Sequence, residues 1–312
     1  MDVSIIIVSW NTRDLLRNCL RSIQQQTVHH SFEVFVVDNA SRDGSAAMVR
    51  DQFPAVHLIA NSDNRGFAAA NNQAIREARG RYVLLLNPDT IILDRAIERS
   101  VTFADVHPDT AVVGCQVWSD DNTVQRTGFA FPGPVNLILA LSGLSRLLPR
   151  SKLFGRPELG WWNRDTETDL EVVSGMFMLV RRTAIEQVGL LDEDYFVYAE
   201  EADWCFRFAK AGWRRRFTPA ARILHLDGGG KSSGQVSARM YVQLQKSLLI
   251  YFRKNLGASA WVAGRMIFIG SNLVRAFLWT AQAVLPGRAG SRSKSAAAVA
   301  ALRFHILGIE PT

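Results

Sequence analysis

The sequence predicts an α/β fold: a mainly parallel central sheet flanked by helices, in a Rossmann-like arrangement, with an appended helical tail. Apolar, β-branched runs such as Val3–Ser9 alternate with amphipathic segments through roughly the first ninety of the 312 residues. The connections between them are short, which is typical of βαβ units and a parallel sheet. The last part of the chain breaks this alternation and becomes apolar and basic. We therefore expect an α/β domain over residues 1–240 and a basic amphipathic helical tail over 241–312.

The strands expected in the first part of the domain are continuous apolar runs, as strands covered on both faces of a sheet should be. They are Val3–Ser9, Phe32–Val37, Val56–Ala60 and Tyr82–Leu86. The segments between them place apolar residues on one helical stripe and polar residues opposite. These expected helices are Thr12–Gln25, Ala46–Gln52 and Phe67–Arg79, the last of which is stopped by Gly80.

The second part of the domain continues the series less regularly. Three further strands are expected at Ala111–Val117, Val172–Val180 and Arg222–His225, and two further helices at Ala184–Val188 and Ala202–Ala211. Between residues 131 and 162 the pattern loosens into an insert punctuated by proline and glycine, with an apolar helical stretch at Val135–Leu148.

Charge and cysteine content exclude several classes of protein. Residues 1–240 hold 27 Lys and Arg against 28 acids, whereas residues 241–312 hold nine against one, which together give the net charge of +7. Basicity confined to an apolar tail argues against a nucleic-acid partner. Cys19, Cys115 and Cys205 form no C-x-x-C pair, which excludes a disulfide framework and a thiolate zinc site. The N-terminus has no basic region before its short apolar run, so we expect a cytoplasmic protein.

Polar residues follow each of the first four expected strands. In open α/β sheets ligands bind beyond the carboxyl ends of the strands, although such residues also cap helices. The first of these turns, SWNTRD, lacks the glycines of a dinucleotide-binding domain or a P-loop. A nucleotide would therefore be held by side chains and a metal, and Asp89 is suited to Mg²⁺ or Mn²⁺. The four groups are Ser9-Trp10-Asn11, Asp38-Asn39, Asn61–Arg65 and Asn87-Pro88-Asp89.

Three acids, Glu200, Glu201 and Asp203, lie together at the start of an expected helix that also carries aromatic residues. Acids in a first helical turn interact favourably with the helix dipole, so simple capping explains them. Crowded carboxylates beside aromatic residues also suit a general base, because crowding raises one pKa. His225 ends the last expected strand, where a lone histidine is usually structural. Both interpretations stay open on the residues alone.

Six motifs occurring in order over residues 3–233 give the sequence a family resemblance. They are IIIVSWN, VVDNASRDGS, NRGFAAANNQAI, YVLLLNPDT, SGMFMLVRR and FVYAEEADWCFRFAKAGW. In this order they resemble the family 2 glycosyltransferases, and most closely the bacterial rhamnosyltransferase-like branch. The resemblance implies a GT-A fold and metal-dependent, inverting transfer of a sugar from a nucleotide-sugar donor. It does not extend to the tail.

The resemblance assigns roles to individual residues. Asp38 matches the acid that binds the pyrimidine base, and Asp89, in Asn87-Pro88-Asp89 at the D-x-D position, matches the metal carboxylate. His225 matches the histidine that completes the metal site in several members, and Glu201 falls on the usual catalytic base, normally Asp. Glu200 and Asp203 complete the expected catalytic cluster. The expected donor-binding residues are Ser9, Asn11, Asp38, Asn39, Asn64, Arg65, Gly66, Asn87 and Asp89.

The resemblance also bounds the substrates. It makes dTDP-rhamnose the first expected donor, followed by UDP-hexoses, and implies a polyprenyl-linked or polysaccharide acceptor in cell-surface glycan synthesis. We expect the hexose to be contacted by residues 173–176 and 195–201. We expect the insert at 131–162 to lie near the site that binds the acceptor. A catalytically weak sugar-nucleotide-binding scaffold at the membrane is the alternative, because Asn87 and Glu201 depart from the family pattern. A nucleotidyltransferase is disfavoured, because SWNTRD does not supply a Gly-rich basic loop.

The apolar and basic sequence of the tail predicts that it contacts the anionic surface on the inner face of the cell membrane. Residues 258–285 are mostly apolar and long enough to cross a bilayer, but Arg265 and Arg275 make spanning costly. On a helical wheel these two residues cluster with Asn272 and Gln282, opposite an apolar side. Residues 135–152 form a second expected contact. The alternative, that both segments pack on the catalytic domain or form a homo-oligomer interface, stays open.

Overall fold

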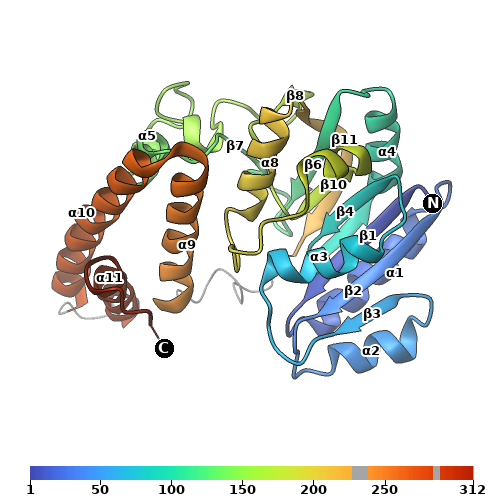
Figure 1. The fold of residues 1–312 in the computed structure, drawn as a ribbon, viewed down its shortest axis with the longest axis horizontal. Helices are drawn as coiled ribbons and strands as arrows, with labels where there is room; N and C mark the ends of the chain where they lie inside the picture. Colours follow the sequence, from blue (N-terminus) through green and yellow to red (C-terminus); the bar gives the residue numbers. More distant parts are fainter. Residues whose placement is uncertain (227–237, 284–288, 312) are drawn as a thin grey trace.

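The central sheet of the computed structural model is mixed and contains nine strands among the residues that the structure describes, 1–226, 238–283 and 289–311 (Figure 1). Eight strands follow one another across the sheet, and β8 (Thr168–Asp169) pairs with one of them, β11. The order is β3 (His57–Ala60), β2 (Phe32–Asp38), β1 (Val3–Ser9), β4 (Tyr82–Leu86), β10 (Phe177–Arg181), β6 (Thr110–Trp118), β11 (Arg214–His225) and β5 (Thr90–Leu93).

The direction of the strands changes at the middle of the sheet. β3, β2, β1 and β4 are parallel neighbours, as their alternation with helices predicts. β10 then runs antiparallel to both β4 and β6, and β5 runs antiparallel to β11. The parallel arrangement therefore covers the first four strands and the pair β6–β11, and the remaining pairs are antiparallel.

Helices cover both faces of this sheet, which explains why its strands are apolar throughout. On β1, Ile5 and Ile7 pack with α1 (Arg13–Gln26), α2 (Ser45–Gln52) and α4 (Ala96–Asp105). Ile6 faces the opposite way and packs with the second set of helices. That set is α3 (Phe67–Glu77), α7 (Arg182–Val188) and α8 (Glu200–Lys210).

Two expected elements are each divided in the structure. The run 172–180 was expected as one strand, but it forms β9 (Val172–Val173), a turn and then β10. β9 leaves the main sheet and pairs with β7 (Gly128–Phe129). The stretch 135–148 was expected as one helix, but it forms α5 (Pro134–Leu141) and α6 (Leu144–Leu147). The break falls at Gly143, whose φ of 81° is accessible to glycine and ends the first helix.

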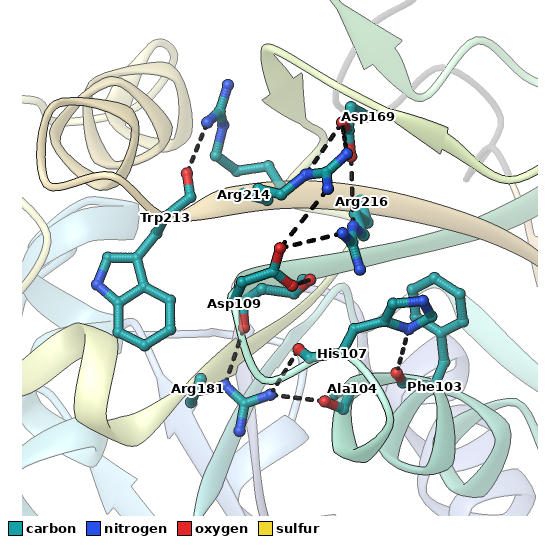
Figure 2. A network of polar contacts seen from close by, with 11 residues as sticks. Phe103, Ala104, His107, Asp109, Asp169, Arg181, Trp213, Arg214 and Arg216 are labelled. Atoms are coloured by element: carbon teal, nitrogen blue, oxygen red, sulfur yellow. Dashed lines mark hydrogen bonds and ion pairs between the residues drawn. The ribbon is translucent and has the colours of Figure 1, made fainter.

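The strand β11 begins eight residues earlier than the sequence predicts, because an ion-pair network holds its first residues in the sheet. Arg214 and Arg216 pair with Asp169 on β8 and with Asp109 at the start of β6 (Figure 2). Arg181 donates to backbone carbonyls of the α4–β6 connection in the same region. The basic run in this segment is therefore structural.

The tail is a group of helices that packs against the catalytic domain. It contains α9 (Ala238–Tyr251), a π-helical stretch η2 (Phe252–Leu256), α10 (Ala258–Ala283) and α11 (Ala289–Leu307). In Figure 1 α9 lies between the catalytic domain and α10. Tyr251, Phe252 and Phe268 of the tail join the apolar core of the catalytic domain. Among the described residues no helix is both long enough and apolar enough to span a bilayer.

Candidate active site

The polar strand ends meet at one edge of the sheet. Ser9 on β1 pairs with Asp38 on β2, and Asp38 pairs with Ala60 on β3. β4 lies beside β1 in the same direction. The loops that follow these four strands therefore start from neighbouring positions and form one polar rim, as the sequence predicts.

Asp38 carries a buried hydrogen-bond acceptor that the protein leaves unused. Its side chain is 3% exposed, and Oδ2 accepts a hydrogen bond from the backbone N–H of Ser41 at 3.1 Å. Oδ1 has no hydrogen-bond partner. Because a buried carboxylate oxygen without a partner is costly, such an atom is typical of a site that a ligand donor completes. The predicted contact with a base N–H fits this oxygen.

Ser9 and Asn11 shape the rim loops. Ser9 Oγ lies 2.9 Å from Thr12 Oγ1 at the start of α1. Asn11 adopts a φ of 55°, and its backbone N–H donates to Ser41 Oγ at 2.9 Å. Its Oδ1 accepts from the backbone N–H of Arg42 at 2.8 Å. The two residues expected to bind the donor thus hold the β1 and β2 loops together.

Asn39 organises the loop before α3. Its Nδ2 donates to Asn64 Oδ1 at 3.2 Å and to the carbonyl of Gly66 at 3.0 Å, while its Oδ1 accepts from Asn61 Nδ2 at 3.0 Å. Asn64 in turn accepts from the Gly66 N–H. Asn39 and Asn64 therefore fix the loop, whereas the side chain of Arg65 is 48% exposed and lies 3.8 Å from Asp63 Oδ1.

Gly66 joins this rim to the segment that leads into α8. Its φ of 81° and ψ of −179° belong to a region that only glycine adopts readily. A Cβ at this position would lie 2.3 Å from the carbonyl oxygen of Phe196. That oxygen accepts a hydrogen bond from the Phe67 N–H at 2.6 Å. The polar rim, which we also call the donor rim, is consequently in direct backbone contact with the segment that leads from Phe196 to the acids of α8.

Asp89 and His225 meet where β5 begins and β11 ends. The two strands pair in antiparallel register, with Thr90 opposite His225, and Leu226 N–H donates to the Asp89 carbonyl at 2.8 Å. His225 Nε2 lies 3.2 Å from Asp89 Oδ1, yet Oδ1 has no hydrogen-bond partner. The sequence-predicted pair, 136 residues apart in the chain, is therefore brought together by the sheet.

The geometry of this pair fits a divalent cation. Two ligands that are each about 2.1–2.2 Å from one ion lie roughly 3 Å apart when they occupy adjacent positions. The observed 3.2 Å between the imidazole Nε2 and the carboxylate Oδ1 suits that arrangement. No cluster of three or more potential ligands occurs in the described part of the chain. Asn87 lies two residues before Asp89, and its N–H donates to the Met176 carbonyl at 3.1 Å.

Glu200 and Glu201 form a pair of carboxylates in the first turn of α8. Burial raises the pKa of both, and the charge of Glu201 raises that of Glu200 further. One oxygen of each has no hydrogen-bond partner. Glu200 is only 4% exposed, whereas Glu201 is partly exposed. Of the two residues, Glu201 is the more exposed.

Both carboxylate oxygens of Asp203, the third acid of the cluster, accept hydrogen bonds from other side chains. Its Oδ2 accepts from Arg207 Nε at 2.8 Å, and its Oδ1 accepts from Asn255 Nδ2 at 2.8 Å. The side chain is 3% exposed. Asp203 is therefore placed to hold α8 in position, and its neighbours on the helix carry the unpaired oxygens.

The tail holds the segment that carries these acids. Ser247 on α9 donates from Oγ to the Val197 carbonyl at 2.8 Å. Lys254 in η2 pairs with both Asp192 and Asp194. Directly after Val197, Tyr198 and Ala199 adopt φ values of 72° and 66°, a region that costs non-glycine residues free energy. The tail contacts thus help to maintain a strained entry into α8.

The comparisons identify the family. A family model described as glycosyl transferase family 2 matches residues 4–189, more than half of the chain. The chain therefore belongs to glycosyl transferase family 2 and is a glycosyltransferase, which confirms the family resemblance seen in the sequence.

Several relatives agree with the rhamnosyltransferase-like branch. An N-acetylglucosaminyl-diphospho-decaprenol L-rhamnosyltransferase of Mycobacterium tuberculosis is 27% identical over 239 residues, which are 71% of this chain and 75% of the relative. The rhamnosyltransferase WbbL of Escherichia coli is 24% identical over 233 residues, 72% of this chain and 83% of the relative.

A solved structure confirms the predicted GT-A fold. The mannosyltransferase PcManGT from Pyrobaculum calidifontis, in complex with GDP-Man and Mn²⁺, superposes with a TM-score of 0.58 at 20% identity. The match covers 99% of this chain and 88% of that chain. At this identity the likeness concerns the fold alone.

Two parts of the site have no signal in the sequence. The Gly66–Phe196 contact joins residues 130 positions apart, and nothing in either local pattern indicates that they touch. The tail residues Ser247, Lys254 and Asn255 look like ordinary polar positions of a surface helix. Only the packing of α9 and η2 on the segment before α8 gives them a role.

Proposed function

We propose that this glycosyltransferase is inverting and metal-dependent, and that it moves a sugar from a nucleotide-sugar donor to a polyprenyl-linked or polysaccharide acceptor. One observation carries the proposal: the hydrogen bond from Phe67 N–H to the Phe196 carbonyl brings the segment bearing Glu201 against the donor rim. A proton acceptor and a nucleotide-binding edge are then parts of one site.

The donor is expected along the polar rim. Asp38 Oδ1, buried and unpartnered, accepts from an N–H of the pyrimidine base. Arg65, on the loop fixed by Asn39 and Asn64, reaches the diphosphate. Asn87, two residues before Asp89 in the chain, would contact the ribose. The rim therefore supplies a side-chain contact for each part of the nucleotide.

Asp89 and His225 are the residues that would hold Mg²⁺ or Mn²⁺. When bound, such an ion neutralises charge that develops on the diphosphate leaving group. Asp89 contributes the carboxylate and His225 an imidazole nitrogen, and the antiparallel β5–β11 pairing keeps both in place.

Glu201 acts as the general base. Its carboxylate takes the proton from the acceptor hydroxyl while that oxygen forms a bond to the anomeric carbon. The bond between the anomeric carbon and the phosphate oxygen breaks, and the nucleoside diphosphate leaves with the electron pair. A single displacement of this kind inverts the anomeric configuration. The raised pKa of Glu201 makes it a stronger proton acceptor than an ordinary carboxylate.

The names of the relatives support rhamnose as the sugar and a decaprenyl-diphosphate-linked acceptor. We therefore propose dTDP-rhamnose as the first donor to examine, with UDP-hexoses next. A lipid-linked acceptor also places the reaction at the inner face of the cell membrane.

A donor screen tests the proposal. Purified protein with Mg²⁺ or Mn²⁺ is incubated with a panel of nucleotide sugars, and nucleotide release is measured with and without lipid-linked acceptors. We expect release with one deoxythymidine or uridine donor that rises when acceptor is added and stops with EDTA. Binding of a donor without turnover under any condition would instead support the scaffold alternative.

A further inference from the structure

The outward side of α10 is apolar and uncovered. Val262, Met266, Leu273 and Phe277 are between 51% and 75% exposed, and their spacings of four, seven and four residues put them on one stripe. Val274 and Leu278 widen this stripe and are 58% and 49% exposed. We call these six residues the α10 face. In Figure 1 the helix lies on the side of the tail away from the sheet, and its 26 residues extend over about 39 Å.

The inward side of the same helix buries Phe268 and also carries polar side chains. Asn272 is fully buried, accepts from Tyr241 Oη at 2.7 Å and donates to Gln245 Oε1 at 2.9 Å. The same Gln245 oxygen lies 2.8 Å from His305 Nε2, and burial lowers the pKa of this histidine to about 4. These side chains form a hydrogen-bonded polar centre between α9, α10 and α11.

Both charged side chains of α10 also turn inward. Arg265 donates to the His305 carbonyl at 2.9 Å, and Arg275 donates to Tyr241 Oη at 3.0 Å. A helix in water normally buries its apolar side and exposes its charges. α10 buries Phe268 in the ordinary way, but it also turns both arginines inward and leaves six large apolar side chains uncovered. An uncovered stripe of this kind marks a surface that something else covers.

A cationic, apolar segment lies next to this helix. α5, which packs against α10, leaves Val135 and Ile138 67% and 49% exposed. The residues that follow add exposed apolar and basic side chains with no acid from 133 to 157. Arg156 of this range pairs with Glu171, whereas three of its basic side chains have no ion-pair partner in the described part of the chain. These three are Arg146, Arg150 and Lys152, beside exposed Leu147, Leu148 and Leu153.

We propose that the α10 face, with the segment after α5, docks on an anionic lipid bilayer, with α10 lying along the membrane surface. Apolar side chains enter the acyl boundary while the flanking cations meet anionic headgroups. A second copy of the chain fits the surface less well. A symmetric contact through this surface would bring the unpaired cations Arg146, Arg150 and Lys152 of two copies together, with no acid from 133 to 157 to offset them.

The inference rests on the described side chains of the tail and deepens the proposed function in one respect. A polyprenyl-linked acceptor keeps its reactive hydroxyl at headgroup level. Docking through α10 and α5 brings the catalytic domain to that level without inserting it. The lipid surface would then present the acceptor to the enzyme.

The test is flotation of the full-length protein with vesicles of phosphatidylcholine, with and without phosphatidylglycerol. We expect binding to the anionic vesicles that weakens with salt. The double variant Leu273→Gln/Phe277→Gln should lose roughly tenfold or more of this binding. Its matched control changes two valines with similar exposure on the catalytic domain, Val28→Gln/Val106→Gln, and should bind as the unmodified protein does.

A second pair of variants tests the charges. Removing three cations in Arg146→Gln/Arg150→Gln/Lys152→Gln should weaken binding to anionic vesicles by about fivefold per cation and leave neutral vesicles unaffected. The control removes three exposed cations elsewhere in the chain and should change little. Its substitutions are Arg21→Gln, Arg50→Gln and Arg79→Gln.

Three results would overturn the inference. The first is failure of the unmodified protein to float with anionic vesicles, and the second is unchanged binding by the Leu273→Gln/Phe277→Gln variant. The third is a dimer by light scattering that this variant converts to a monomer, which would assign the α10 face to a second copy. Nucleotide release with a water-soluble acceptor should be equal in all variants, so loss of docking is distinguishable from failure of the proposed reaction.

Discussion

Replacing Gly66 with alanine should separate the donor rim from the segment that carries the catalytic acids. Two costs arise at this position. The backbone adopts φ 81° and ψ −179°, and a new Cβ would lie 2.3 Å from the Phe196 carbonyl oxygen and 2.8 Å from Phe196 Cδ2. Because real contacts of a Cβ are longer, either Gly66 or Phe196 must move. The hydrogen bond from Phe67 to that carbonyl would then be distorted.

Gly189 provides a matched control. It has nearly the same conformation, φ 86° and ψ −179°, but a Cβ added there would meet no atom within 4 Å. Gly189→Ala should therefore cost only the conformational strain, about 1–3 kcal/mol. Gly66→Ala should cost about 1–3 kcal/mol more, because the Cβ is forced into a packed contact.

The assay combines urea unfolding with steady-state kinetics. Gly66→Ala should lower the free energy of unfolding more than Gly189→Ala does and should also raise the KM for the donor and lower kcat. Gly189→Ala should leave the kinetic constants of the folded enzyme near those of the unmodified protein. Equal destabilisation by the two variants, with unchanged kinetics, would refute the idea that this contact couples the two halves of the site.

Three further predictions concern single side chains. Burial raises the pKa of Glu200 in the native state, so the native state binds this proton more tightly than the unfolded chain does. The Glu200 carboxyl therefore lowers the free energy of unfolding as the pH rises above the usual glutamate pKa of 4.5. Glu200→Gln should therefore unfold at higher urea than the unmodified protein near neutral pH, with the difference vanishing at about pH 4; a constant difference would contradict this. Asp89→Ala should abolish transfer and weaken nucleotide binding in the presence of Mn²⁺, and His225→Ala should do likewise less severely; wild-type turnover and EDTA sensitivity in both would exclude the metal site. Asn255→Ala leaves a buried Asp203 oxygen unpaired and should cost about 1–3 kcal/mol in urea unfolding, with kcat reduced more than the donor KM; an unchanged kcat would remove the positioning role of the tail.

The sequence predicts the first part of the fold well, because each strand there is a continuous apolar run bounded by polar turns. The ends of β1 and β4 agree with the expected bounds to the residue. It fails where tertiary contacts decide. β5 and α4, over 90–105, are not expected from the pattern, and residues 214–221 join β11 through ion pairs with Asp109 and Asp169 that lie far away in the chain.

The candidate site shows the same division. The residues that follow strands, such as Asp38 and Asp89, can be identified because strand ends in a parallel sheet share one edge. The residues that hold these side chains in place cannot be identified from the sequence. Asn255 reaches Asp203 only through the packing of η2. Arg265 points inward because it donates to the His305 carbonyl of α11, and the sequence pattern does not predict this contact.

Glu201 as the general base is the central claim, and the turnover of Glu201→Gln tests it most directly. The substitution keeps the volume of the side chain but removes its ability to accept a proton. The measurement is kcat for nucleotide release with saturating donor and acceptor, together with the donor Kd, and Glu77→Gln, an exposed position on α3, serves as control. We predict that kcat falls by roughly 10²–10⁴ while the donor Kd is little changed and Glu77→Gln is fully active. Wild-type turnover in Glu201→Gln, or a larger loss in Glu200→Gln, would contradict the assignment.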